Sequence, residues 1–270
     1  KEAPMSRIAI FIVVLLCLGG LAFAAGGTRQ KQVKPYEYGT VTINNFSAAA
    51  GLGPVTFDHW VHRSRFTCRL CHVDLGFTMK AGASEIKAAD NIRGYFCGAC
   101  HNGTFKVDNR TVFKACLKSP TAEEARQCSR CHNKERNPER AEAFFRFAEK
   151  MPKERLGNGI NWERAEQEGL VKPIDYLPGI SMKRAPMVIQ KDFALEAKVQ
   201  GLPEIIFSHK KHTVWNGCEV CHPEVFAGVK KGMTKYTMLD LIDGKYCGIC
   251  HKSVAFPLQD CQRCHSKSVS

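Results

Sequence analysis

The pattern of hydrophobic and polar residues predicts one long apolar helix near the start of the chain and only short elements after it. Residues 8–28 carry no charge, and a helix of that length would span about 30 Å, enough to cross a bilayer. Two amphipathic stretches, 138–151 and 161–169, predict short helices, the second capped by Asn161 and ended by Gly169. Elsewhere we expect mainly α-helix and coil, with little β-structure.

We expect the apolar run to form an N-terminal transmembrane anchor over residues 1–29. Lys1 and Arg7 precede the run, which places the N-terminus in the cytoplasm by the positive-inside rule, although basic residues also follow it. The alternative is a cleaved signal peptide, for which Ala22-Phe23-Ala24 offers a small-x-small cleavage site.

The chain repeats itself. Two copies of Phe-x-His-x-x-His each stand five residues before a Cys-x-x-Cys-His motif, and every landmark from His59 to His101 recurs 150 residues later, from His209 to His251. The repeat predicts two similar modules. We call residues 30–135 the first module, 136–200 the connector and 201–270 the second module.

Six copies of Cys-x-x-Cys-His carry the candidate chemistry and use twelve of the 14 cysteines and six of the ten histidines. Two cysteines at this spacing can bond to the two vinyl groups of one haem, and the histidine that follows becomes the proximal iron ligand. Zinc knuckles or redox cysteine pairs are the alternatives, but neither requires a histidine after every second cysteine. We therefore predict six covalently bound haem c groups. The cysteines are Cys68, Cys71, Cys97, Cys100, Cys128, Cys131, Cys218, Cys221, Cys247, Cys250, Cys261 and Cys264, and the histidines are His72, His101, His132, His222, His251 and His265.

Composition changes this picture little. The formal charge of +13 suggests an anionic partner. A ferric haem with two neutral ligands adds a charge of about −1 and a ferrous one about −2. Six haems would therefore leave a net charge of roughly +7 in the oxidised protein and roughly +1 in the reduced protein. No nucleic-acid-binding motif accompanies the charge, and we expect no nucleic-acid partner. Haems also supply apolar surface, so the 44% of hydrophobic residues is sufficient.

The four histidines outside the motifs all belong to the Phe-x-His-x-x-His copies. A spacing of three places both imidazoles of a copy on one helical face, close enough to reach two adjacent haems. We therefore predict that His59, His62, His209 and His212 are distal iron ligands. Cys116 stands outside every motif and is predicted to be a buried free thiol.

These motifs resemble the class III c-type cytochromes, which are small trihaem and tetrahaem electron carriers, over residues 57–132 and 207–265. The resemblance implies a class III-like fold with two trihaem modules. In that family the first histidine of the pair binds the first haem of its module and the second binds the third. Carried over, the resemblance implies these pairs: His59 with His72, His62 with His132, His209 with His222, and His212 with His265.

The middle haem of each module departs from the resemblance, because no histidine stands just before its motif. Methionine is the obvious soft substitute. We favour Met238 in the second module, with Met233 as the alternative, and Met79 in the first module. Two connector methionines, Met182 and Met187, are further candidates. A five-coordinate haem at the second motif is the other alternative.

An anchor followed by two trihaem modules resembles the multihaem subunits of periplasm-facing quinone oxidoreductases, namely alternative complex III and the quinone reductase complex of sulfate reducers. The resemblance implies an electron-transfer subunit of a bacterial inner-membrane complex, with its haems in the periplasm and no catalytic site of its own. The implied partners are membrane lipid, a soluble periplasmic c-type cytochrome, and molybdopterin-oxidoreductase-like, iron–sulfur and polytopic quinone-binding subunits.

Three other functions fit parts of the sequence. A stand-alone, membrane-anchored quinol dehydrogenase would donate to periplasmic reductases. A catalytic multihaem reductase of nitrite or hydroxylamine would need an open haem. An extracellular-wire cytochrome would not need an inner-membrane anchor.

Overall fold

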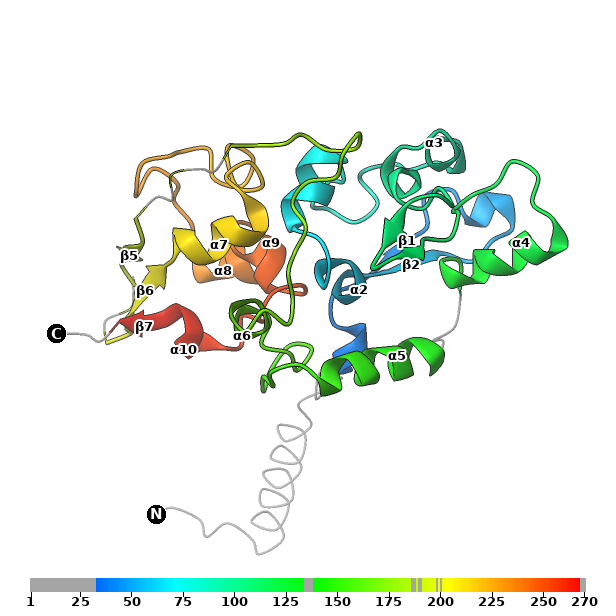
Figure 1. Ribbon diagram of the computed structural model, residues 1–270. Helices are drawn as coiled ribbons and strands as arrows, with labels where there is room; N and C mark the ends of the chain where they lie inside the picture. Colours follow the sequence, from blue (N-terminus) through cyan, green and yellow to red (C-terminus); the bar gives the residue numbers. More distant parts are fainter. Residues whose placement is uncertain are drawn as a thin grey trace, which may run out of the picture. The chain divides into compact units, whose positions relative to one another are not determined.

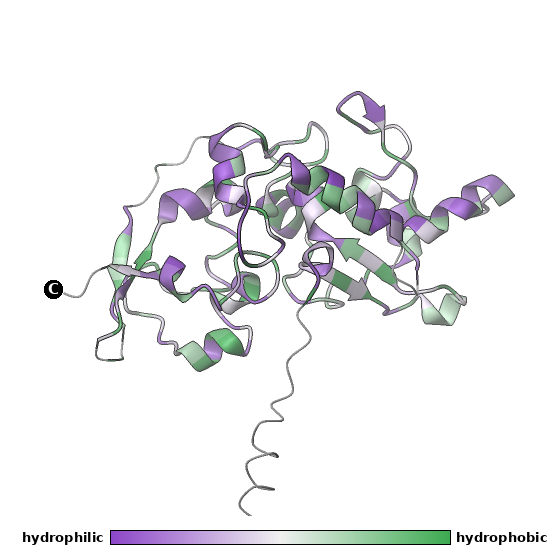
Figure 2. Cartoon of the chain, turned by 90° about the horizontal axis from the view of Figure 1, so that it is seen from below, coloured by the Kyte–Doolittle hydropathy of each residue, from purple (hydrophilic) through white to green (hydrophobic). Residues whose placement is uncertain are grey.

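The computed structural model describes residues 33–133, 138–185, 188, 191–197, 199 and 201–267. The predicted anchor and Met187 lie outside these residues. The chain from Pro35 onward forms one unit. Within the described residues no helix is both long enough and apolar enough to cross a membrane, and Figure 2 shows hydrophilic and hydrophobic positions mixed along them.

Short helices and coil make up most of this unit, as predicted (Figure 1). The α-helices are α2 (His59–Arg63), α3 (Ala88–Ile92), α4 (Ala122–Arg126), α5 (Pro138–Glu149), α6 (Trp162–Gln167), α7 (His209–Asn216), α8 (Met238–Ile242), α9 (Gly248–His251) and α10 (Cys261–Cys264). Single turns of other helix types are η1 (Pro35–Glu37), η2 (Ala48–Ala50), η3 (Leu70–Asp74), η4 (Phe96–Ala99) and η5 (Gln127–Arg130).

The strands are short and form three small antiparallel sheets, β1–β2, β3–β4 and β5–β6–β7. They are β1 (Thr40–Ile43), β2 (Val55–Asp58), β3 (Lys106–Val107), β4 (Arg110–Thr111), β5 (Phe193–Leu195), β6 (Glu204–Phe207) and β7 (His265–Lys267).

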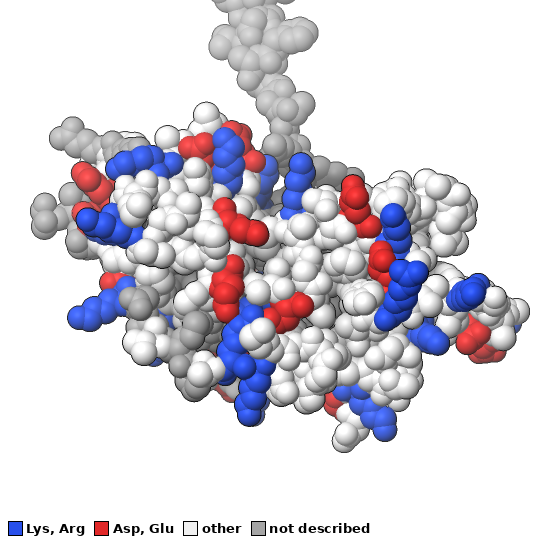
Figure 3. Space-filling view, turned by 90° about the horizontal axis from the view of Figure 1, so that it is seen from above, with Lys and Arg blue, Asp and Glu red and all other residues white. Residues whose placement is uncertain are grey.

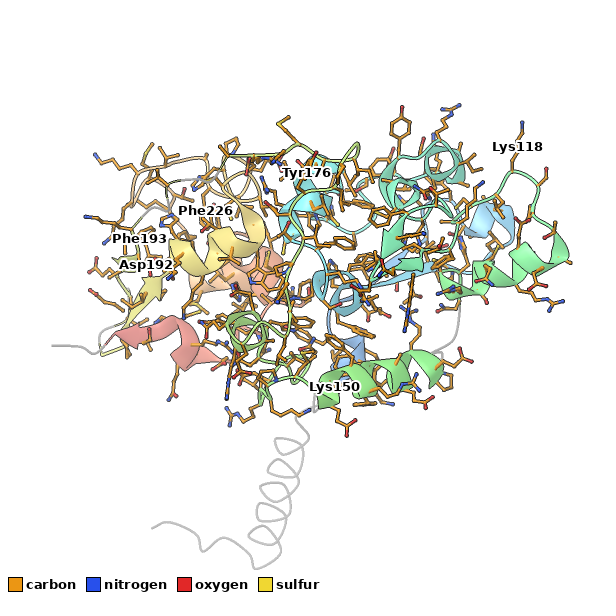
Figure 4. The ribbon with its side chains drawn as sticks, viewed as in Figure 1. Lys118, Lys150, Tyr176, Asp192, Phe193 and Phe226 are labelled. Carbon is orange, nitrogen blue, oxygen red and sulfur yellow. The ribbon has the colours of Figure 1, made fainter. Side chains whose placement is uncertain are left out.

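Each module presents its pair of histidines in the same way. An antiparallel strand pair, β1–β2 or β5–β6, leads directly into the helix that carries the two histidines, α2 or α7. Val41 lies opposite Phe57 in the first module. Phe193, which is labelled in Figure 4 and lies near the end of the connector, lies opposite Phe207 of the second module. The predicted repeat is therefore visible as a repeated local structure.

The connector contains the two helices that its sequence predicts. α5 begins at Pro138 and ends at Glu149. α6 follows Asn161, whose side-chain oxygen accepts a hydrogen bond from the Arg164 backbone N–H at 3.0 Å, which caps the helix start. Gly169 adopts a left-handed conformation, with φ of +70°, just beyond the end of α6.

The main hydrophobic core lies where α2, α5, α6 and α7 meet. The Trp60 and Phe144 rings pack edge to face with centroids 5.3 Å apart, and Phe144 is only 1% exposed. Trp162 of the connector and Trp215 of the second module belong to the same core. Both modules are therefore packed on the connector. The buried members are Trp60, Phe144, Ala148, Ile160, Trp162, Ala165, Val171 and Trp215.

Charged side chains tie the rest of the connector to both modules. Arg184 donates to Asp74 of the first module at 2.7 Å and to Glu219 of the second at 2.8 Å. Arg69, whose side chain is 4% exposed, pairs with Asp175, which adjoins the labelled Tyr176 in Figure 4. On the face seen in Figure 3, acidic and basic side chains are interspersed.

Candidate functional site

The six Cys-x-x-Cys-His motifs share one large cavity. Its volume is about 2050 Å³, well above the roughly 300–1000 Å³ of an ordinary ligand pocket. The lining includes at least one cysteine of every motif and aromatic side chains such as Phe226 (Figure 4). The lining cysteines are Cys68, Cys71, Cys97, Cys100, Cys131, Cys221, Cys247, Cys250, Cys261 and Cys264.

All ten histidines of the chain place their Nδ1 atom against a backbone carbonyl oxygen. A carbonyl oxygen can only accept, so Nδ1 carries the proton and Nε2 keeps its lone pair, the arrangement in which imidazole binds a metal through Nε2. The motif histidines pair as follows: His72 with Phe77 (2.8 Å), His101 with Phe113 (3.3 Å), His132 with Gly53 (2.8 Å), His222 with Phe226 (2.7 Å), His251 with Phe256 (2.9 Å) and His265 with Pro203 (2.8 Å). The others pair as follows: His59 with Gly39 (2.6 Å), His62 with Asp58 (3.3 Å), His209 with Lys191 (3.0 Å) and His212 with Ser208 (2.7 Å).

Three pairs of imidazole rings face each other at the separation that an iron between them requires. Metal–imidazole bonds of about 2 Å on both sides would place the ring centroids roughly 6 Å apart. The observed centroid distances are 6.5 Å for His59 and His72, 6.2 Å for His62 and His101, and 6.1 Å for His212 and His251. The residues present therefore fit haem iron with two histidine ligands.

Two of these pairs differ from those that the class III resemblance implied. His62 faces His101 rather than His132, and His212 faces His251 rather than His265. The expectation that His101 and His251 have no histidine opposite them is therefore wrong.

The position of the third motif explains the difference. His132 lies beside β2, where it bridges to Val55, and His265 begins β7 and pairs with Ile205 of β6. Each third-motif histidine is thus held along the strand that precedes the histidine helix. The second histidine of that helix instead meets the middle motif.

At both middle motifs a histidine lies opposite the motif histidine, where the sequence predicted a methionine. Met79 and Met238 both line the cavity, and Met238 is 46% exposed. Met182 and Met233 are more exposed, at 68% and 62%.

Burial keeps the facing imidazoles neutral. It lowers the pKa of His59, His62 and His251 to about 4. These side chains are therefore uncharged at neutral pH, as a metal ligand must be.

Three of the motif cysteines lack the lowered pKa of a reactive thiol. Burial raises the pKa of Cys71, Cys97 and Cys250 to about 12, whereas a reactive thiol pair needs a lowered pKa. A zinc site needs four convergent ligands. Among the residues that the structure describes, no three His, Cys, Asp or Glu side chains converge on a metal-ion position.

Cys116 is only partly buried, although we predicted a buried thiol. The Asn91 side-chain amide donates to its Sγ at 3.6 Å.

The phenylalanine of each Phe-x-His-x-x-His copy is a site residue that motif analysis did not assign. The Phe57 ring stacks on His62 with centroids 4.4 Å apart, and it meets His59 edge-on at 4.9 Å. Phe207 repeats both contacts in the second module, at 4.5 Å to His212 and 5.0 Å to His209. Recurrence of phenylalanine in both copies was the available signal.

Comparison with protein families finds one match. The model of the family described as cytochrome c7 and related cytochrome c matches residues 55–133 and 205–266, together just over half of the chain. A search of curated proteins finds no match.

Three solved structures are similar in sequence. A c7-type three-heme cytochrome domain is 36% identical, with 28% of this chain and 93% of that chain covered and a TM-score of 0.26. A C-terminal hexaheme fragment is 26% identical over 84% of this chain and 97% of that chain, with a TM-score of 0.26. An N-terminal hexaheme fragment of the same protein is 21% identical over 85% and 99%, with a TM-score of 0.24. These TM-scores are too low to support a shared spatial arrangement.

Proposed function

Because the chain belongs to the family of cytochrome c7 and related cytochromes c, we propose that this multihaem cytochrome carries six covalent haems and relays electrons through them. One observation carries the proposal. Every histidine presents Nε2 as its metal-binding atom, and three pairs of rings already face each other at 6.1–6.5 Å.

The residues of the chain have distinct roles in this proposal. The motif cysteines would attach each haem, and the motif histidine would bind its iron. His59, His62 and His212 would supply the second ligand at the His72, His101 and His251 sites, and the repeat assigns His209 to His222. When bound, haem supplies reversible one-electron chemistry at iron. The chain holds the ligand rings in place through their Nδ1 hydrogen bonds and covers them with apolar side chains.

This assignment uses all four histidines outside the motifs, so the His132 and His265 sites take no histidine of this chain as a second ligand. It also moves the open position that a nitrite or hydroxylamine reductase would need. His62 faces the His101 site, so that function would now depend on an open haem at His132 or His265.

We further propose that the chain is the electron-transfer subunit of an inner-membrane quinone oxidoreductase complex. Electrons would arrive from a soluble periplasmic c-type cytochrome and leave toward molybdopterin-oxidoreductase-like, iron–sulfur and polytopic quinone-binding subunits. The support is the uncharged run at 8–28, which suits a membrane anchor in lipid, together with the hexahaem pattern that resembles such subunits.

The test combines cofactor counting with native purification. The denatured chain should gain the mass of six haems, and a pyridine haemochrome assay should give six per chain. Purification from native membranes should recover quinone-binding and iron–sulfur subunits in constant ratio. A haem count of five or fewer contradicts the assignment of the motifs, and a chain that purifies alone from mild detergent contradicts the proposed complex.

A further inference from the structure

Arg63 ends α2, but its side chain reaches the second module. Its Nη1 donates to the Val254 carbonyl oxygen at 3.1 Å, three residues after His251. Its guanidinium carbon lies 4.3 Å from the ring centroid of Trp162 and 5.2 Å from that of Trp215. A positive charge is therefore held between aromatic rings of the connector and of the second module.

The chain around this contact joins the ligand-holding segments of the two modules. The Tyr38 hydroxyl donates to the Ala255 carbonyl oxygen at 2.6 Å. Gly39 has φ of +81°, and a Cβ at this position would lie 3.5 Å from both the Ser253 oxygen and the His59 Cβ. Gly39 also accepts the His59 Nδ1 hydrogen bond at 2.6 Å. The loop after His251 thus packs on the turn that orients His59.

Haem-attachment cysteines from both modules lie in the same region. Arg63, Cys68 of the first module and Cys250 of the second module line the same cavity.

Arg63 also has a polar atom without a partner. Its Nε is buried and makes no hydrogen bond among the described residues, and Arg63 lines the cavity. An unpaired buried donor is destabilising, and a haem carboxylate would satisfy it.

We propose that Arg63 sets the reduction potentials of two haems at the junction of the modules, those ligated by His59–His72 and by His212–His251. Reduction of ferric haem adds one negative charge, and a partly buried, poorly screened cation stabilises the reduced form. An electron crossing the junction leaves ferrous iron on one side and reduces ferric iron on the other, so no further reactant is needed. This inference rests on the proposed haem relay.

The repeat provides a natural substitution. Thr213 of the second module stands 150 residues after Arg63, and its hydroxyl donates to the His209 carbonyl oxygen at 2.8 Å. The equivalent helix therefore accommodates threonine, and Arg63→Thr should assemble even if Arg63→Gln does not.

The experiment is a spectroelectrochemical titration of the full haem-loaded chain, with individual haems resolved by electron paramagnetic resonance. In Arg63→Gln and Arg63→Thr, the ferrous-to-ferric ratio of two haems at a fixed potential should fall at least tenfold, which is 59 mV for a one-electron couple. Arg63→Lys, which keeps the charge, should shift less. The control Arg164→Gln removes an equal charge from an exposed part of α6 and should leave the titration unchanged.

The outcomes separate this inference from the haem assignment. Titrations of Arg63→Gln and Arg63→Thr that overlay the wild type would overturn the role of Arg63. An equal shift in Arg63→Lys would also overturn it, because packing and not charge would then be responsible. Fewer than six haems in the wild-type chain would instead refute the proposed function.

Discussion

The two histidine helices, α2 and α7, hold equivalent histidines but differ in the residues between them. The ring centroids of His62 and His101 lie 6.2 Å apart in the first module, and those of His212 and His251 lie 6.1 Å apart in the second. The intervening positions have diverged: Trp60 of α2 is buried in the main core, whereas the equivalent Lys210 is exposed. The spacing of the paired histidines is thus the same in both modules. The residues between the histidines differ, because α2 packs in the main core at a position where α7 is exposed to solvent.

The residue before each helix differs for the same reason. Ser208 caps α7 through its hydroxyl, which accepts from the Lys211 backbone N–H at 3.4 Å. The equivalent Asp58 makes no such cap. Its buried carboxylate instead accepts from Arg140 of the connector, with Nε at 2.8 Å. In the first module, the residue before the histidine helix therefore forms an ion pair with the connector, whereas in the second module it caps the helix.

Loss of a facing histidine should have the largest effect. His62→Ala should convert the His101 haem from low spin to high spin, and His212→Ala should do the same at His251, because each removes an iron ligand. Electron paramagnetic resonance of the ferric protein measures the change.

The third motif provides the control for this prediction. His62→Ala is repeated in a parent that carries Cys128→Ser and Cys131→Ser and therefore lacks the His132 haem. The high-spin signal should persist in that parent. If the signal disappeared, His62 would be the ligand of the His132 haem, and the His62–His101 pair would no longer be equivalent to the His212–His251 pair.

Arg140→Ala should destabilise the first module by about 3 kcal/mol, because the buried Asp58 carboxylate loses its cationic partner and keeps, among the described residues, only the hydrogen bond from the Thr40 hydroxyl. The Asp58 side chain is 9% exposed and that of Arg140 is 22% exposed. Chemical denaturation monitored by circular dichroism measures the loss. The control is Arg146→Ala on the same helix, which removes an ion pair that is 70% and 67% exposed and should cost less than about 1 kcal/mol. Equal losses would show that the Asp58 pair has no special importance.

The smallest effect is expected for Lys211→Val, which places the residue of the first module, Val61, in the second. Lys211 pairs with Glu163 at 2.7 Å, but its side chain is 59% exposed. Exposed ion pairs contribute about 0–1 kcal/mol, so the unfolding midpoint should hardly move, and less still at high salt. A loss above about 2 kcal/mol would show that this pair holds the second module to the connector.

Several features could be predicted from sequence because they depend on neighbouring residues. The attachment motifs, the 150-residue repeat and the i, i+3 spacing of the histidines are local patterns. The connector helices carried their own signals, including the Asn161 cap and the break at Gly169. Cys116 was predicted less well, since burial of a lone thiol depends on its surroundings.

Haem binding could thus be predicted from the sequence, because thioether attachment and a proximal histidine require only five consecutive residues. Which motif histidine each histidine of α2 and α7 faces could not be predicted, since it depends on where strands far apart in sequence place the third motifs, as in the bridge from Val55 to His132. The same holds for Arg63. Its hydrogen bond to Val254 spans 191 residues, and only the folded packing of both modules on the connector brings that charge to their junction.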